Sequence, residues 1–279
     1  MDDVLSLYGE MHAPTTAAPK RIAYAVHALL TFWSGRTLDQ VSKQTCKAYA
    51  RSRERAAGTV RRELTALRAA INFAHEEGRL TRPVPVWLPE APPGKDRWLT
   101  RAEAATLLNA ARSAGRGARL YLPLFILIAL YTGARKEAIL SLRWRQIDLE
   151  RRLIDFAGEA RQTNKRRARI PIPDRLMTFL RLARLRSSEA GYVIHRDGRR
   201  LGDIKRAFAS ACRGANLAEV SPHTLRHTCG TWLAHRGVPL FEIGGWLGHS
   251  HERTVELYAH HSPDHLLRAK RAADRRRSE

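Results

Sequence analysis

A proline-rich segment divides this chain and limits how it can fold. Residues 82–95 contain five prolines, at positions 83, 85, 89, 92 and 93, with Gly94 behind them. Proline lacks the backbone N–H that a helix interior or a central strand needs, so neither element can continue through this segment. The sequence therefore predicts a first domain over residues 1–89, a linker over 90–97 and a second domain over 98–279.

The first domain carries the spacing of amphipathic helices. Apolar residues recur every three to four positions over residues 21–33, 42–49 and 60–74, and the faces between them are rich in arginine. We expect a small all-helical domain whose basic faces suit DNA binding.

The second domain mixes helices with a small sheet. An uncharged apolar run over residues 120–131 predicts a buried helix, since a membrane span takes about 20 apolar residues. Over residues 146–172 the apolar positions alternate instead, which predicts antiparallel strands with turns near Arg151 and Asn164. A further short strand is expected over 192–195. The predicted fold class is mostly α with a small antiparallel β-sheet (α+β).

The charge of the chain indicates a polyanionic partner. Lysine and arginine number 49 against 27 aspartate and glutamate, for a net charge of +22. At 44% hydrophobic residues the chain can still bury a core, so this charge lies on a folded protein and not on a disordered tail. DNA or RNA is the partner that such a protein most often binds.

The cysteines and the opening residues bear on location. The three cysteines, Cys46, Cys212 and Cys229, are scattered and odd in number, which fits a reducing compartment better than a disulfide framework. No basic-then-apolar leader opens the sequence. We expect a cytoplasmic, nucleoid-associated protein without a membrane partner.

Four short segments stand out for their chemistry. In chain order they are Thr132-Gly133-Ala134-Arg135, the basic turn around Lys165, His223-Thr224-Leu225-Arg226, and Leu247-Gly248-His249 followed by Tyr258. Each residue alone has an ordinary interpretation, such as a surface arginine, a capping histidine or a core tyrosine. The string His-x2-Arg-x22-His-x8-Tyr, however, arises by chance in roughly one chain of this length in several hundred.

These residue types can cleave a phosphodiester by covalent catalysis. Tyr258 can attack phosphorus to give a phosphotyrosine. Arg135 and Arg226 can bind the non-bridging oxygens, which gain charge in the transition state. Lys165 can protonate the leaving 5′-oxygen as a general acid. His223 can accept the tyrosine proton or hydrogen-bond the phosphate.

His249 can hydrogen-bond the same phosphate oxygens. No step in this scheme requires a metal ion, because the guanidinium groups already supply positive charge. The phosphotyrosine bond conserves the energy for rejoining, so ATP is not required either. We predict no cofactor and no metal site.

At these residues the chain resembles the tyrosine recombinase (phage integrase) family. The likeness to the family's catalytic domain runs from Trp98 to about Arg268, and the first ninety residues resemble its helical, SAM-like core-binding domain in pattern. The resemblance implies an active site made of Arg135, Lys165, His223, Arg226, His249 and Tyr258.

The resemblance also implies an activity and an assembly. It implies a site-specific recombinase or integrase that cuts and rejoins double-stranded DNA through a 3′-phosphotyrosine intermediate. A homotetramer on two synapsed DNA sites would exchange strands through a Holliday junction. A C-terminal helix carrying Leu266 and Leu267 would dock on the neighbouring protomer, and a solvated, fraying terminus is the alternative for this segment.

The sequence departs from the family pattern in one position and leaves another open. The family often has an acidic residue three positions after the first arginine, where this chain has Ala138, with Glu137 one residue early. Lys165 is the only lysine between positions 136 and 205, which singles it out as the general acid. Arg161 and Arg166 are the alternatives to it.

Three other functions remain open at this level. A metal site could use His223, His227, Cys229 and His249, although it would leave both arginines and the tyrosine unexplained. A type IB topoisomerase would use similar chemistry to relax DNA. A non-catalytic basic DNA-binding protein would account for the charge but not for the spaced motifs.

Overall fold

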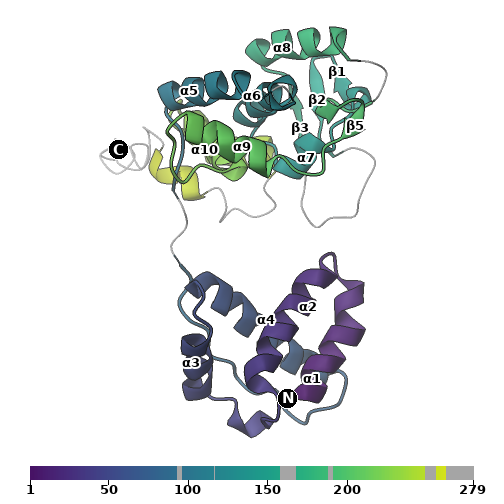
Figure 1. The fold of residues 1–279 in the computed structure, drawn as a ribbon, viewed down its shortest axis with the longest axis vertical. Helices are drawn as coiled ribbons and strands as arrows, with labels where there is room; N and C mark the ends of the chain where they lie inside the picture. Colours follow the sequence, from purple (N-terminus) through teal and green to yellow (C-terminus); the bar gives the residue numbers. More distant parts are fainter. Residues whose placement is uncertain (93–95, 116, 158–167, 188–190, 249–255, 262–279) are drawn as a thin grey trace, which may run out of the picture. The chain divides into compact units, whose positions relative to one another are not determined.

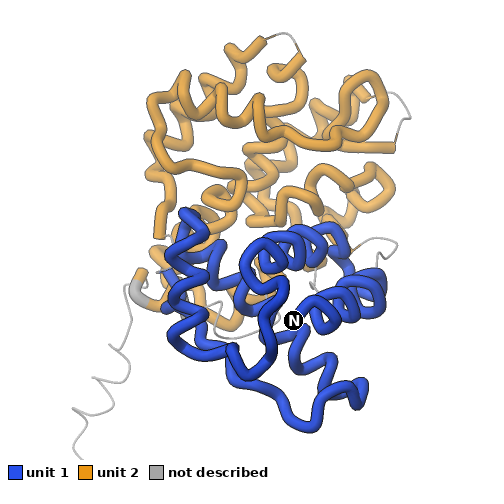
Figure 2. The backbone as a smooth tube through the Cα atoms, turned by 60° about the horizontal axis from the view of Figure 1, so that its bottom comes forward, with its two compact units in different colours: residues 1–95 blue, residues 96–279 orange. Residues whose placement is uncertain are grey.

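The chain folds into two compact units, residues 1–95 and 96–279 (Figure 2). The structure is a computed structural model and describes residues 1–92, 96–115, 117–157, 168–187, 191–248 and 256–261. The boundary between the units falls at the end of the proline-rich segment. No helix in these described ranges is long and apolar enough to cross a membrane.

Unit 1 is a helical bundle built on one long helix (Figure 1). Its helices are α1 (Asp2–Leu7), α2 (Pro19–Trp33), α3 (Lys43–Ser52) and α4 (Ala57–Glu76), with short helical turns at Tyr8–His12, Ala13–Thr15 and Leu38–Gln40. Helix α4 contacts α1, α2 and α3. The apolar stripes expected from the sequence supply its core, which includes the fully buried Trp33, Leu64 and Leu67.

A buried polar group joins α3 to α4. The Tyr49 hydroxyl donates to Glu63 Oε2 at 2.7 Å, and Arg53 donates to both oxygens of the same carboxylate at 2.9 and 2.8 Å. Because the carboxylate is satisfied on both oxygens, it can stay charged inside the core.

Unit 2 is organised around helix α6. Its helices are α5 (Arg101–Arg112), α6 (Leu122–Thr132), α7 (Lys136–Leu140), α8 (Asp174–Leu185), α9 (Lys205–Gly214), α10 (Pro222–Ala234) and α11 (Leu240–Leu247), with 3-10 turns at Ala118–Leu120, Trp144–Gln146 and Glu256–His261. Helix α6 contacts α5, α7, α8 and α10. Nearly all of its side chains are buried, which confirms the predicted buried helix.

Two small antiparallel sheets complete unit 2. The first has the order β1 (Ile147–Asp148), β2 (Leu153–Asp155), β3 (Arg169–Pro171), with Ile154 opposite Ile170. The predicted turn near Asn164 lies outside the described residues. The mostly α fold with small antiparallel sheets agrees with the predicted class.

The strand predicted over 192–195 is placed differently in the structure. Tyr192 makes only an isolated bridge to Arg143, and the strands β4 (His195–Arg196) and β5 (Arg199–Arg200) form a hairpin just beyond it. The hairpin turns at Asp197 and Gly198, whose φ angles of 51° and 76° suit the tight turn that joins twisted strands. The observed strand therefore lies a few positions later in the sequence than expected, because the turn residues set its register.

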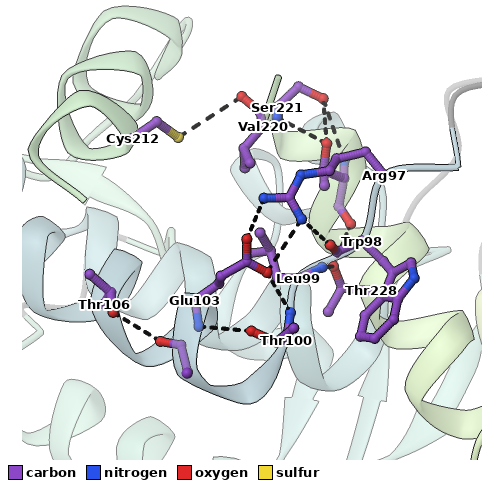
Figure 3. Close-up of polar contacts among 12 residues, drawn as sticks. Arg97, Trp98, Leu99, Thr100, Glu103, Thr106, Cys212, Val220, Ser221 and Thr228 are labelled. Atoms are coloured by element: carbon purple, nitrogen blue, oxygen red, sulfur yellow. Dashed lines mark hydrogen bonds and ion pairs between the residues drawn. The ribbon is translucent and has the colours of Figure 1, made fainter. Parts of the chain in front are cut away.

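The segment that opens unit 2 is hydrogen-bonded to α10 (Figure 3). The Leu99 N–H donates to Thr228 Oγ1 at 2.9 Å, and Trp232 Nε1 donates to the Leu99 carbonyl at 3.0 Å. The next residue, Thr100, caps α5 and exchanges hydrogen bonds with Glu103. The N–H and the carbonyl of Leu99 are thus both hydrogen-bonded to α10, and together they fix the position of this helix.

We expect Thr228→Val to lower the free energy of unfolding of unit 2 by about 1–3 kcal/mol, because the buried Leu99 N–H loses its acceptor. Thr106→Val is the matched control, since Thr106 also donates to the carbonyl four residues earlier but lies exposed on α5. Urea denaturation followed by circular dichroism measures both. Equal losses in the two variants would contradict the role given to Thr228.

Candidate active site

Helix α6 is followed by a glycine at a position that has no room for a larger residue. Gly133 has φ +63°, a left-handed conformation that L side chains rarely adopt. A Cβ at this position would collide with Leu247 Cδ2 and lie 3.3 Å from Cys229 Cβ. The tight turn brings α11 and α10 against the end of α6 and leads directly to Arg135, the N-cap residue of α7.

Arg226 is a buried cation held by that same turn. Its side chain lies on α10, is 2% exposed, and donates from Nη1 to the Gly133 carbonyl at 2.7 Å. Its Nη2 is buried without a hydrogen-bond partner in the part of the chain that the structure describes. Burial, and then the charge of Arg135, lower the pKa of Arg226 to about 10. A buried donor of this kind is suited to an anionic ligand.

Arg135 lies beside Arg226 and contacts the fourth motif, Leu-Gly-His. Its Nη1 donates to the Gly248 carbonyl at 3.4 Å, and Gly248 ends α11 with φ +65°. The two arginines line one small cavity of about 20 Å³, roughly the room of one water molecule. Its other walls are Thr132, Ala134, Ala138, Phe156, Ala168, Trp246 and Leu247. The motifs Thr-Gly-x-Arg, His-x2-Arg and Leu-Gly therefore meet in space.

Tyr258 lies in the 3-10 turn at Glu256–His261 and packs on α10. It is 2% exposed and belongs to a small apolar cluster with Cys229, Ile243 and Leu247. The hydroxyl-bearing end of its ring lies against Gly230, where an added Cβ would be 2.6 Å from Tyr258 Cε1 and 2.9 Å from Cε2. Burial raises the pKa of Tyr258 to about 12, while the charge of Arg226 opposes that rise.

Two histidines of α10 lie near this tyrosine. The Tyr258 hydroxyl is 3.4 Å from His227 Nδ1. His223, in the exposed first turn, places its ring edge-to-face with His227 at 4.6 Å between centroids. The helix begins here because Ser221 caps it and Pro222 occupies its first turn. His223 and Arg226 thus share a helix face, as their spacing predicts.

The remaining predicted residues can be placed only in part. Lys165 and His249 lie outside the described residues. Glu137 lies one residue before the position that is often acidic in the family. It is exposed and forms ion pairs with Lys136 at 3.5 Å and with Arg200 at 3.1 Å. Ala138 is buried against the cavity. The carboxylate nearest to Arg135 in sequence is therefore engaged by other cations at the surface.

The alternative metal set is not assembled in the described ranges. Among those residues the structure brings together no group of three His, Cys, Asp and Glu side chains that could hold an ion. His249, the fourth member of the set, lies outside them.

Sequence reasoning missed two residues of this site. His227 was weighed only as a metal ligand, and Gly230 was not singled out. Both share the helix face of His223, at spacings of four and seven residues. That periodicity was the signal that could have found them.

Solved structures share this fold. The structure of the Tn1549 transposon integrase in complex with transposon right end DNA matches with a TM-score of 0.78 at 18% identity, covering 97% of this chain and 99% of that one. A lambda integrase dimer bound to a COC′ core site matches with a TM-score of 0.70 at 17% identity, covering 92% and 76%. The fold is that of an integrase.

Sequence comparison then gives the family. Residues 97–265 match the model of the phage integrase family. The tyrosine recombinase XerA of Thermococcus kodakarensis is 31% identical over 215 residues, which are 75% of this chain and 72% of that protein. The integrase of Salmonella phage P22 is 26% identical over 78% of this chain, which spans only 58% of that protein. The chain belongs to the phage integrase family of tyrosine recombinases.

We expect Gly133→Ala to lower the free energy of unfolding of unit 2 by about 2–4 kcal/mol, because left-handed strain adds to the collision with Leu247. Gly191→Ala is the control. Gly191 has φ +79°, but an added Cβ would meet only the end of Arg143 at 3.4 Å, so it should lose only about 1 kcal/mol. Thermal and urea unfolding compare the two. A loss no larger at Gly133 would argue against its close-packing role.

Proposed function

We propose that this chain is a site-specific DNA recombinase that cuts and rejoins strands through a 3′-phosphotyrosine at Tyr258. One observation carries the proposal. The buried Arg226 guanidinium is fixed by Gly133 and lies beside Arg135, its Nη2 has no hydrogen-bond partner among the described residues, and the tyrosine packs on the same helix. A phosphate would supply both the acceptor and the negative charge that this site favours.

In this proposal the two arginines stabilise the transition state. Attack on phosphorus moves negative charge onto the non-bridging oxygens, and fixed guanidinium donors stabilise that charge without reorganising. Arg226 is held in position by the hydrogen bond of 2.7 Å from its Nη1 to the Gly133 carbonyl. The low-dielectric surroundings strengthen its interaction with the phosphate.

The proposed roles of the other residues complete the reaction. His223 and His249 hydrogen-bond the phosphate, and Lys165 protonates the leaving 5′-oxygen as general acid. The built-in cations take the part that metal ions take in many phosphoryl-transfer enzymes. The phosphotyrosine retains the bond energy, so rejoining requires no nucleotide. We therefore propose a reaction without a cofactor.

The proposed substrate is double-stranded DNA. The net charge of +22 supports a polyanionic partner, and the similar integrase structures contain bound DNA. We propose a homotetramer on two synapsed sites, acting in the cytoplasm at the nucleoid. The C-terminal helix expected to dock on a neighbour lies outside the described residues. Named relatives are recombinases and integrases, which favours strand exchange over DNA relaxation or binding alone.

We expect Tyr258→Phe to abolish covalent protein–DNA adducts while DNA affinity stays within about twofold, because only the nucleophilic oxygen is removed. The protein is incubated with genomic fragments from the organism that carries this gene, and adducts are separated under denaturing conditions and sequenced. Mass spectrometry of the wild-type adduct should place DNA on Tyr258. Adducts formed by the phenylalanine variant would refute the assignment of the nucleophile.

We expect Arg226→Ala and Arg135→Ala each to slow cleavage by about 10²-fold or more, because each removes a donor that acts in the transition state. Single-turnover cleavage at saturating protein separates this effect from weaker binding. Arg112→Ala, on the exposed end of α5, is the control for loss of one positive charge. If either arginine variant cleaves at the rate of the control, that arginine is only structural.

A further inference from the structure

We propose that His227, the residue directly after the buried arginine, accepts the Tyr258 phenol proton as the tyrosine attacks phosphorus. This inference rests on the proposed function and adds a catalytic residue to it. Its basis is position: His227 Nδ1 is 3.4 Å from the phenol oxygen. Hydrogen bonds between catalytic groups are often this long before substrate binds and shorten in the reacting complex.

The packing of the tyrosine fixes this contact. Gly230 lies one turn beyond His227 on α10 and allows the Tyr258 ring to lie directly on the helix. The His227 and Tyr258 rings are 6.1 Å apart between centroids and inclined at 52°. A ring held against the backbone has little freedom to turn its hydroxyl away, so the phenol oxygen stays near Nδ1.

The two histidines of α10 differ in burial and in neighbours. His227 is half-buried between His223 and Tyr258, with its ring centroid 4.6 Å from that of His223. His223 lies in the exposed first turn, on the face that also carries Arg226. We therefore assign His223 to the phosphate and His227 to the tyrosine.

The surroundings of His227 favour its neutral, proton-accepting form. Burial, and then the charge of Arg226, hold the pKa of His227 below its usual value, while Asp96 opposes that shift. Among the described residues, the titratable and charged groups near His227 are His223 and Arg226 on its own helix, Asp96 from the segment that opens unit 2, and Tyr258. The proposed step uses the neutral tautomer that carries its proton on Nε2 and offers the Nδ1 lone pair to the phenol.

The proposed step conserves atoms and charge. The phenol oxygen forms a bond to phosphorus as its proton passes to His227 Nδ1. The bond from phosphorus to the 5′-oxygen breaks, and that oxygen takes a proton from Lys165. In the rejoining step a 5′-hydroxyl returns its proton to Lys165 as it attacks the phosphotyrosine, and the departing phenol oxygen takes its proton back from His227.

Two substitutions test the assignment by formation of covalent adducts with the genomic fragments. His227→Asn places an amide oxygen near the Nδ1 position but cannot take up a proton, and His227→Phe keeps the ring without an acceptor. Both should form adducts at least about tenfold more slowly, because a general base contributes roughly 10²–10⁴. His235→Asn, an exposed histidine just after α10, is the control and should react like wild type.

Chemical rescue distinguishes proton transfer from packing. His227→Ala opens a space beside Tyr258 that imidazole can enter, and added imidazole should restore adduct formation. Pyrazole has the same size but is a far weaker base, so it should not restore adduct formation. Equal rescue by both would show that His227 only fills space, and this would overturn the proposal.

The outcomes separate this inference from the function on which it rests. If the wild-type protein forms no adduct, the proposed function fails. If wild type forms adducts and His227→Asn and His227→Phe form them within about threefold of that rate, only the role of His227 is overturned. Circular dichroism melting shows that each variant is folded, and the rescue experiment stands by itself if His227→Phe is not.

Discussion

The hydrogen bond from Arg226 to the Gly133 carbonyl is the contact on which the site depends. It joins α10 to the end of α6, the most buried helix of unit 2, and fixes a guanidinium in the interior. Burying a cation costs free energy unless something compensates. Here the packing of a whole domain holds the charge in place, so one of its donors remains available to a ligand.

The arginine and the tyrosine then influence each other through the same helix. Burial, and to a smaller extent Cys229, raises the pKa of Tyr258, and the charge of Arg226 partly offsets this rise. Burial lowers the pKa of Arg226, and the tyrosine partly offsets that effect in turn. Each group therefore makes the charged form of the other less unfavourable. This arrangement suits a reaction in which the phenol loses its proton next to an anion-binding cation.

The sequence could predict the parts of this structure that depend on local pattern. The buried helix α6 followed from an uncharged apolar run. The approach of Arg135 to Arg226 was expected from the chemistry of the motifs and their resemblance to the recombinase family. The slot for Tyr258 could not be predicted, because it depends on contact between Gly230 and a residue 28 positions later in the chain. The strand expected over 192–195 was misplaced because the turn at Asp197 and Gly198, and not the apolar pattern, sets the register of β4 and β5.

Two closely packed glycines make the site sensitive to mutation at positions that carry no reactive side chain. Gly133 and Gly230 each lack room for even one methyl group, at the floor of the arginine pair and under the tyrosine ring. A single-base change from glycine to alanine, usually among the mildest exchanges, would disturb the chemistry at either position. Inactive copies of such a gene could therefore retain every reactive side chain and still have lost function through these two codons.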